Sequence, residues 1–368
     1  MRMTQLKTIA DIQTGPFGSQ LHKEDYVETG TPIVTVEHLG NRVFTEQNLP
    51  RVSDSDKARL IKYTLSTGDI VFSRVGSVDR CSYVDKSHDG WMFSGRCLRV
   101  RPTELVDSLY LYYYFCLEET KQFVRNIAVG ATMPSINTKL LGEVEIALPD
   151  LNNQKRIAAV LSSLDDKIEN NQKLNDNLQQ QAMALYAEMF LNSSDNNVTS
   201  GTLSDIAAIT MGQSPSGSSY NEDGVGEVFY QGRAEFGFRF PKRRLFTTEP
   251  KRMAETGDVL LSVRAPVGDL NVAYERCCIG RGLGAIHSKT GHSSFVLYTM
   301  FALRSQLDVF NGEGTVFGSI NRDALNAIPI DIPPVTEIDQ FEAVAHPIDE
   351  LIRANYEENC RLEAIRDS

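Results

Sequence analysis

The chain contains an internal duplication, and this repeat constrains its fold more than any other feature of the sequence. Three segments return in the same order: 6–12 (LKTIADI) at 203–209 (LSDIAAI), 67–73 (TGDIVFS) at 256–262 (TGDVLLS), and 130–137 (GATMPSIN) at 314–321 (GTVFGSIN). The offset between matching positions falls from 197 to 189 to 184 along the chain, so the second copy has shorter loops. The ordered matches predict two similar globular domains.

Each copy is expected to end in a long helix. A helical pattern without glycine or proline runs from about Gln154 to Phe190, and a second runs from about Glu337 onward, with Pro347 expected to kink or delay it. A shorter helical stretch precedes each, near 105–124 and 295–310, and short β-like runs such as 70–73 and 259–262 come earlier. The predicted class is α+β, with boundaries at 1–150, 151–192, 193–334 and 335–368.

Apolar residues of the two long helices recur at alternating spacings of three and four, which is typical of a coiled-coil seam. The predicted seam contains two asparagines on each helix and consists of Ile157, Leu161, Leu164, Ile168, Asn171, Asn175, Leu178, Ala182, Leu185 and Met189, and of Phe341, Ala345, Ile348, Ile352, Asn355, Asn359 and Leu362. An antiparallel pair in which facing numbers add to 530 sets Asn171 against Asn359 and Asn175 against Asn355. Two alternatives remain: each helix packs on its own domain, or the asparagines face water or a partner helix.

No catalytic, metal-binding or cofactor-binding motif is recognisable. There is no G-x-x-x-x-G-K loop and no H-E-x-x-H, the six cysteines include no C-x-x-C pair, and the six histidines are never paired at metal-ligand spacing. We therefore expect no catalytic residue, metal or cofactor in this chain. No apolar run approaches the roughly 20 residues that span a bilayer, and the first residues lack a secretory signal, so a cytoplasmic location is expected.

Positive charge is local, because the chain as a whole carries a net charge of −11. Residues 335–368 hold nine acidic residues against three arginines, whereas residues 233–252 hold seven basic residues against two glutamates, interleaved with phenylalanines. Phosphate contacts and arginine forks to guanine suit such patches. The candidate contacts are Arg42, Arg74, Arg80, Arg233, Arg239, Lys242, Arg243, Arg244 and Arg264. A solvated face, or a grip on another subunit, is the alternative for each.

These motifs resemble the specificity (S) subunit of type I restriction-modification enzymes. The resemblance covers nearly the whole chain and is strongest at 154–161 (QKRIAAVL) and 164–168 (LDDKI), with support from 14–19 (TGPFGS), 67–69 (TGD) and 130–137. The second copy departs from the pattern by having Ile338 where Gln154 stands in the first, and by Pro347.

The resemblance implies two target recognition domains joined by two conserved helices packed antiparallel. Each domain would read one half of a bipartite, asymmetric site in double-stranded DNA. Two methylation subunits, which use S-adenosylmethionine, would bind the helices and domains, and ATP-driven restriction subunits would join the complex. The chain itself would be non-catalytic. The alternatives are the recognition part of a single-chain restriction enzyme and a two-domain scaffold that does not bind DNA.

Overall fold

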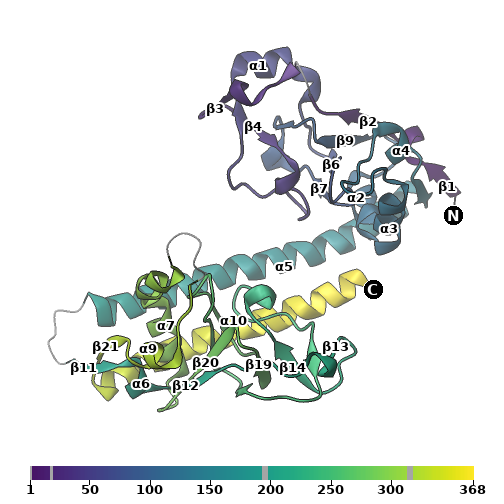
Figure 1. The fold of residues 1–368 in the computed structure, drawn as a ribbon. Helices are drawn as coiled ribbons and strands as arrows, with labels where there is room; N and C mark the ends of the chain where they lie inside the picture. Colours follow the sequence, from purple (N-terminus) through teal and green to yellow (C-terminus); the bar gives the residue numbers. More distant parts are fainter. Residues whose placement is uncertain (1, 17–19, 193–197, 313–317) are drawn as a thin grey trace. The chain divides into compact units, whose positions relative to one another are not determined.

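Two units of similar topology make up the described part of the chain, residues 2–16, 20–192, 198–312 and 318–368 of a computed structural model (Figure 1). Unit 1 comprises Met1–Ile168 and Leu362–Ser368, and unit 2 comprises Glu169–Arg361. Parts of three sequence features lie outside the described residues: 17–19 of the opening motif, 193–197 of the linker between the copies, and 314–317 of the third repeat.

Unit 1 contains two four-stranded sheets and a two-stranded ribbon. The first sheet has the order β2-β9-β6-β7 with antiparallel neighbours, the second has the order β3-β5-β4-β8 with β4 and β8 parallel, and the ribbon pairs β1 with β10. The strands are β1 (Arg2–Gln5), β2 (Ala10–Thr14), β3 (Tyr26–Val27), β4 (Thr31–Val34), β5 (Arg51–Val52), β6 (Ile70–Ser73), β7 (Cys81–Tyr83), β8 (Met92–Phe93), β9 (Cys97–Pro102) and β10 (Glu145–Leu148).

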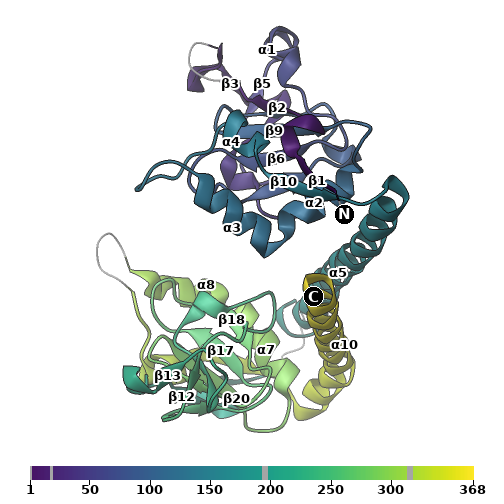
Figure 2. The same ribbon diagram turned by 90° about the vertical axis from the view of Figure 1, so that its right-hand side faces the viewer.

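The helices of unit 1 lie around these sheets (Figure 2). They are α1 (Asp54–Arg59), α2 (Ser108–Cys116), α3 (Glu118–Ile127), α4 (Thr138–Gly142) and the start of α5 (Leu151–Tyr186). Helix α2 packs on the first sheet, where the rings of Phe72 and Phe115 meet edge to face at 4.7 Å. The single helix expected near 105–124 is wrong, because Leu117 is extended (φ −60°, ψ 133°) and separates α2 from α3.

Unit 2 repeats this topology. Its sheets have the orders β12-β20-β17-β18 and β13-β15-β14-β19-β16, and its ribbon pairs β11 with β21. The elements are β11 (Thr199–Thr202), α6 (Leu203–Ile206), β12 (Ala207–Met211), β13 (Tyr220–Asn221), β14 (Glu227–Tyr230), β15 (Phe246–Thr247), β16 (Met253–Ala254), β17 (Val259–Ser262), β18 (Leu270–Val272), β19 (Cys277–Ile279), β20 (Leu283–Ser288), α7 (Ser293–Ala302), α8 (Arg304–Asp308), α9 (Arg322–Asn326), β21 (Pro329–Ile332) and α10 (Val335–Asp367). The predicted duplication is therefore confirmed, with one difference: the second sheet of unit 2 has a fifth strand, β16, at its edge.

Two of the repeated motifs have a direct structural reason. Gly15 and Gly212 pass so close to the carbonyl oxygens of Ser94 and Gly280 that a Cβ atom at either position would overlap them. The Ser-Ile-Asn motif ends in an N-cap in both copies. The side chain of Asn137 accepts a hydrogen bond from the Leu140 amide at 2.9 Å, and Asn321 accepts one from Ala324 at 2.9 Å.

The two long helices begin and end within a few residues of the predicted positions. Helix α5 ends in a π-helical turn at Ala187–Leu191, and α10 begins at Val335 and continues through Pro347 to Asp367. The expectation that Pro347 delays the helix start is therefore wrong, because the helix begins twelve residues before it. Among the described residues, no helix is both long enough and apolar enough to cross a membrane.

Candidate nucleic-acid interface and helix pair

Helices α5 and α10 lie side by side in unit 2 and exchange hydrogen bonds between buried asparagines (Figure 1). The Nδ2 of Asn171 donates to Oδ1 of Asn359 at 2.8 Å, and the Nδ2 of Asn355 donates to Oδ1 of Asn175 at 2.8 Å. Asn171 also donates to Oε2 of Glu358 at 2.7 Å. Residue numbers rise along one helix as their partners fall along the other, so the pair is antiparallel and both pairings add to 530.

The rest of the seam in unit 2 is apolar. Ala182, Phe341 and Ala345 are fully buried in one cluster, against which Leu185, Met189 and Ile348 pack. Leu178 and Ile352 form a second cluster with Phe240 of the globular part. Burial of this stripe supplies the hydrophobic contribution to the pairing, whereas the asparagines supply hydrogen bonds that form only in one register.

The first turns of α5 behave differently. Ala158 is 3% exposed and belongs to the main core of unit 1, against which Leu161 packs. Ile157 is 41% exposed, so its assignment to the seam is wrong, because this part of the helix turns its buried face to its own domain. The alternative of a helix packed on its own domain therefore holds for these turns. Leu164, Ile168 and Leu362 belong to unit 1, where Ile168 is buried and the other two are half-buried.

Arg239, one of the predicted DNA contacts, is buried against the long helices of unit 2. Its Nη1 lies 2.7 Å from Oδ1 of Asp349, and its Nη2 donates to Gln179 at 3.0 Å and to the Tyr298 hydroxyl at 3.3 Å. Tyr298 donates to the same Asp349 oxygen at 2.9 Å, and burial raises the pKa of Tyr298, which keeps the hydroxyl protonated. Only 3% of the Arg239 side chain is exposed, so it is not available to a nucleic acid.

Unit 1 contains a related arrangement, in which the arginine pairs with the aspartate one position further along the helix. Nη1 of Arg42 lies 2.5 Å from Oδ1 of Asp166, and its Nη2 donates to Ser162 at 2.8 Å. The Tyr113 hydroxyl donates to Oδ2 of Asp165 at 2.7 Å, and burial raises the pKa of Tyr113. In unit 2 the arginine and the tyrosine of the globular part thus bind one aspartate of the long helix, whereas in unit 1 they bind two adjacent aspartates. We call these sets the unit 1 clamp (Arg42, Tyr113, Asp165 and Asp166) and the unit 2 clamp (Arg239, Tyr298 and Asp349).

The other predicted contacts of unit 2 lie on its surface. Arg233 pairs with Asp269, Arg243 with Glu275, and Arg244 with Glu235 and Glu222; their side chains are about half exposed, at 48%, 54% and 59%. Lys242 and Arg264 are exposed. Within the described parts of the chain, neither of those two side chains has a hydrogen-bond or ion-pair partner.

The two remaining candidate DNA contacts of unit 1, Arg74 and Arg80, donate hydrogen bonds to backbone carbonyl oxygens. Nη2 of Arg80 donates to the carbonyl oxygen of Leu39, and Nη1 of Arg74 donates to that of Gly95 at 3.2 Å. Arg80 is an exposed residue and Arg74 is half-buried. The structure therefore brings Lys242, Arg243 and Arg244 together through chain adjacency, and it brings the backbones of Arg74 and Arg80 close, because the Ser73 amide donates to the Arg80 carbonyl oxygen at 2.9 Å.

Two kinds of reactive site, metal clusters and buried thiols, can be assessed among the described residues. No group of three or more His, Cys, Asp or Glu side chains could hold a metal ion within the described ranges. Burial raises the pKa of Cys97 and of Cys277 to about 12, so neither thiol is a nucleophile near neutral pH. The aspartates of the repeated Thr-Gly-Asp motif brace their own turns, since Asp69 accepts from the amide of Ser66 and Asp258 from that of Glu255, each at 2.8 Å.

The clamps were not identified from the sequence, although a signal for them exists. Tyr113 and Tyr298 stand 185 positions apart in matching helices, and Asp165 and Asp349 stand 184 apart in the repeated helix motif. An aspartate that recurs at the same place in both copies and is largely buried needs a partner from another element. The offset of 197 between Arg42 and Arg239 matches that of the opening motif and would have indicated which residues those partners are.

Comparison with known proteins gives consistent matches along the chain. The sequence matches the family described as type I restriction modification DNA specificity domain twice, over residues 1–180 and 196–357. It is 30% identical to the putative type I restriction enzyme MjaX specificity subunit of Methanocaldococcus jannaschii, over 98% of this chain and 89% of that protein. It is 24% identical to the MjaIX specificity subunit of the same organism, over 73% of this chain and 68% of the relative.

A solved structure has a similar fold. The crystal structure of the type I restriction-modification S subunit from M. genitalium aligns with 100% of this chain and 94% of its own, with a TM-score of 0.62 and 17% sequence identity. At this identity the match concerns the fold alone, and the fold it shares is the one described above for each unit.

Proposed function

Because the chain belongs to the type I restriction modification DNA specificity family, we propose that it is the DNA-reading subunit of a type I restriction-modification complex. The observation that carries this proposal is the presence of two units with one topology and different basic surfaces. Such units suit the near two-fold symmetry of duplex DNA while reading different sequences. The chain takes no part in bond making or breaking, and its partners supply the cofactors and the chemistry.

In this proposal residues 1–150 and 193–334 are the two recognition domains, and 151–192 and 335–368 are the helices that join them. The DNA contacts of unit 2 come from Lys242, Arg243, Arg244, Arg233 and Arg264. The ion pairs of Arg233 and Arg243 are open enough to water for phosphate to replace their carboxylates. The contacts of unit 1 include Arg74 and Arg80, whereas the two clamp arginines hold structure.

The partners are two methylation subunits and, through the complex, restriction subunits, all acting in the cytoplasm where the DNA is. Two exposed apolar residues support docking on the long helices. Val160 of α5 is 60% exposed and Val344 of α10 is 51% exposed, and they stand 184 positions apart, as equivalent residues of the two copies do. Equivalent exposed apolar side chains suit two copies of one partner subunit.

The decisive experiment is co-expression of the chain with methylation subunits, followed by pull-down and by sequencing of modified bases in the host DNA. We expect a stable complex and one bipartite, asymmetric motif that is methylated only when the chain is present. A stable complex without sequence-dependent methylation would support the scaffold alternative instead.

The basic surface of unit 2 can be tested separately. Replacing Lys242, Arg243 and Arg244 by alanine should weaken DNA binding of the assembled complex and lower its salt slope by about 0.9 for each phosphate that is no longer neutralised. Arg276→Ala is the matched control, because Arg276 is also about half exposed (52%) and ion-paired, to Glu227 at 2.9 Å. Equal salt slopes for the triple variant and the control would remove these residues from the interface.

A further inference from the structure

A hollow of about 570 Å³ opens on the first sheet of unit 1, next to the segment 61–66. Its lining includes Asp11 and Gln13 of β2 and Arg99 and Arg101 of β9. In the β2–β9 ladder Asp11 lies opposite Arg101 and Gln13 opposite Arg99. Residues two apart along a strand share a face of the sheet, so these four side chains leave the same face. The volume falls in the range of small-ligand sites.

The second copy of the fold has no such cluster. The ladder β12–β20 starts with Ala207 opposite Ser288, as β2–β9 starts with Ala10 opposite Pro102. The positions of Asp11, Arg99 and Arg101 are therefore held in unit 2 by Ala208, Ala285 and His287. Ala285 is 2% exposed and part of an apolar cluster. The sheet thus forms without an arginine at this position in unit 2.

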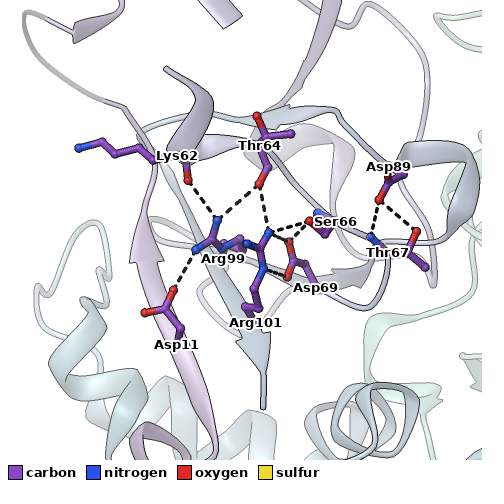
Figure 3. Close-up of polar contacts among 9 residues, drawn as sticks. All are labelled: Asp11, Lys62, Thr64, Ser66, Thr67, Asp69, Asp89, Arg99 and Arg101. Atoms are coloured by element: carbon purple, nitrogen blue, oxygen red, sulfur yellow. Dashed lines mark hydrogen bonds and ion pairs between the residues drawn. The ribbon is translucent and has the colours of Figure 1, made fainter. Parts of the chain in front are cut away.

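The hydrogen bonds of Arg99 are incomplete. The residue is 4% exposed, and its Nη1 donates to the carbonyl oxygens of Lys62 at 3.2 Å and Thr64 at 3.4 Å (Figure 3). Its Nη2 lies 2.9 Å from Oδ2 of Asp11. Within the described ranges, Nε of Arg99 and the buried Oγ1 of Thr64 have no partner. Buried polar atoms without partners are rare in native proteins, so the hydrogen-bonding capacity of Arg99 is not fully used by the protein.

Arg101 lies beside Arg99 and presents a free edge. Its Nε and Nη2 bind the two oxygens of the buried Asp69, each at 2.7 Å, and Nη2 also donates to Ser66 at 3.1 Å (Figure 3). Nη1 has no hydrogen-bond partner in the described part of the chain, and 38% of the side chain is exposed. The ammonium of Lys62 points away from both guanidinium groups in Figure 3, so it does not belong to the cluster.

The charge balance shows how an anion could enter. Two arginines face two aspartates, but the aspartates differ: Asp69 is 1% exposed, whereas 68% of the Asp11 side chain is exposed. An ion pair with so exposed a partner contributes little. A ligand anion can therefore take the place of the Asp11 carboxylate on Arg99 while Asp69 keeps Arg101 oriented. Planar guanidinium groups match phosphate oxygens particularly well.

We propose that this hollow is an oxyanion site that takes a phosphate group between Arg99 and Arg101, displacing Asp11. The phosphate is either inorganic phosphate or a phosphodiester of the DNA backbone. Only the second source rests on the proposed function, and the two arms of the experiment separate the sources.

The first arm titrates the purified full chain with inorganic phosphate, followed by phosphorus NMR line broadening. We expect saturable binding that is lost in Arg99→Ala and becomes about two- to fivefold tighter in Asp11→Asn, the range for loss of one exposed ion pair. Arg99→Ala places at this position the residue that unit 2 has there, Ala285, so the variant should fold, which thermal melting checks. If Arg99→Ala does not fold, Asp11→Asn still tests the site. Lys62→Ala removes one nearby positive charge and should leave binding within about twofold.

The second arm measures the salt dependence of DNA binding by the complex assembled with its methylation subunits. If the phosphate is that of DNA, Arg99→Ala lowers the salt slope by about 0.9, and Lys62→Ala does not. Binding of inorganic phosphate with unchanged DNA slopes assigns the site to a free anion. Absence of saturable phosphate binding together with an unchanged slope overturns the proposal. Failure of the complex to bind any DNA would count against the proposed function and leave the first arm decisive.

Discussion

The unit 2 clamp predicts a large loss of stability when a single charge is removed. In Asp349→Asn the shape of the side chain is kept, but the buried guanidinium of Arg239 loses its counter-charge. Side-chain exposure is 3% for Arg239 and 16% for Asp349, so water cannot replace the carboxylate. Breaking a buried ion pair by removal of one partner costs about 3–5 kcal/mol. With urea slopes of about 2–3 kcal/mol per M, the unfolding midpoint of unit 2 should fall by about 1–2 M.

The unit 1 clamp provides the matched control. Asp166 makes the ion pair with Arg42, one position beyond the equivalent of Asp349, and the two side chains are 58% and 23% exposed. An ion pair this open to water is worth about 0–1 kcal/mol, so Asp166→Asn should shift the midpoint of unit 1 by less than about 0.5 M. The same substitution in the two clamps should therefore differ severalfold in its effect on stability.

The two units can be followed separately in one unfolding experiment. Trp91 is the only tryptophan of the chain and lies in unit 1, so its fluorescence reports on unit 1, whereas circular dichroism reports on both units. Asp349→Asn should shift the circular dichroism transition and leave the fluorescence transition in place. Replacing both members of the pair, as Arg239→Met with Asp349→Leu, should recover much of the loss. Equal shifts in Asp349→Asn and Asp166→Asn would refute the argument from burial.

Three smaller predictions concern stability measured by urea unfolding. Asn171→Leu should cost about 1–3 kcal/mol by removing its buried hydrogen bonds to Asn359 and Glu358, and adding Asn359→Leu should recover part of that loss; a double variant less stable than the single variant would contradict this. Asn321→Ala should cost about 0.5–2 kcal/mol through loss of an N-cap, and no change would mean that the cap is not needed. The pKa of Asp205 is lowered from 3.8 by a hydrogen bond from the Thr202 amide, so its contribution is present above pH 3.8 and lost as pH falls further. Asp205→Asn should remove that part of the acid sensitivity, and an unchanged pH profile would refute the assignment.

Much of the fold could be predicted because the chain contains two copies of one sequence pattern, which can be compared with each other. The duplication predicts two units of one topology, and the heptad spacing predicts the antiparallel asparagine pairs, since both features depend on periodicity along the sequence. The break at Leu117 could not be predicted in this way, because a helical pattern continues across a single extended residue. The continuous helix through Pro347 could not be predicted either, because packing of Phe341, Ala345 and Ile352 on either side of the proline overrides its local helix-breaking propensity.

The candidate interface was less predictable, because charge in a sequence does not reveal burial. Arg239 stands in a basic, aromatic-rich stretch together with Lys242, Arg243 and Arg244, and nothing local distinguishes it from them. Only the tertiary structure shows that it lies against Asp349 while its neighbours are exposed. The asparagine pairs could be predicted, because the internal repeat places two asparagines at matching positions of both helices.

Comparison of the two copies separates residues that hold the fold from residues free to bind something else. The arginine–aspartate ion pairs recur in both units, at Arg42 and Arg239, although the loops around them differ in length. Ion pairs kept through such divergence serve what the units share, which is attachment to a long helix. Arg99 has no equivalent in unit 2, and the positions of Lys242–Arg244 are held in unit 1 by residues 45–47 (TEQ). Charge that appears in one copy only is not required by the common fold, and this is where two units that read different half-sites must differ.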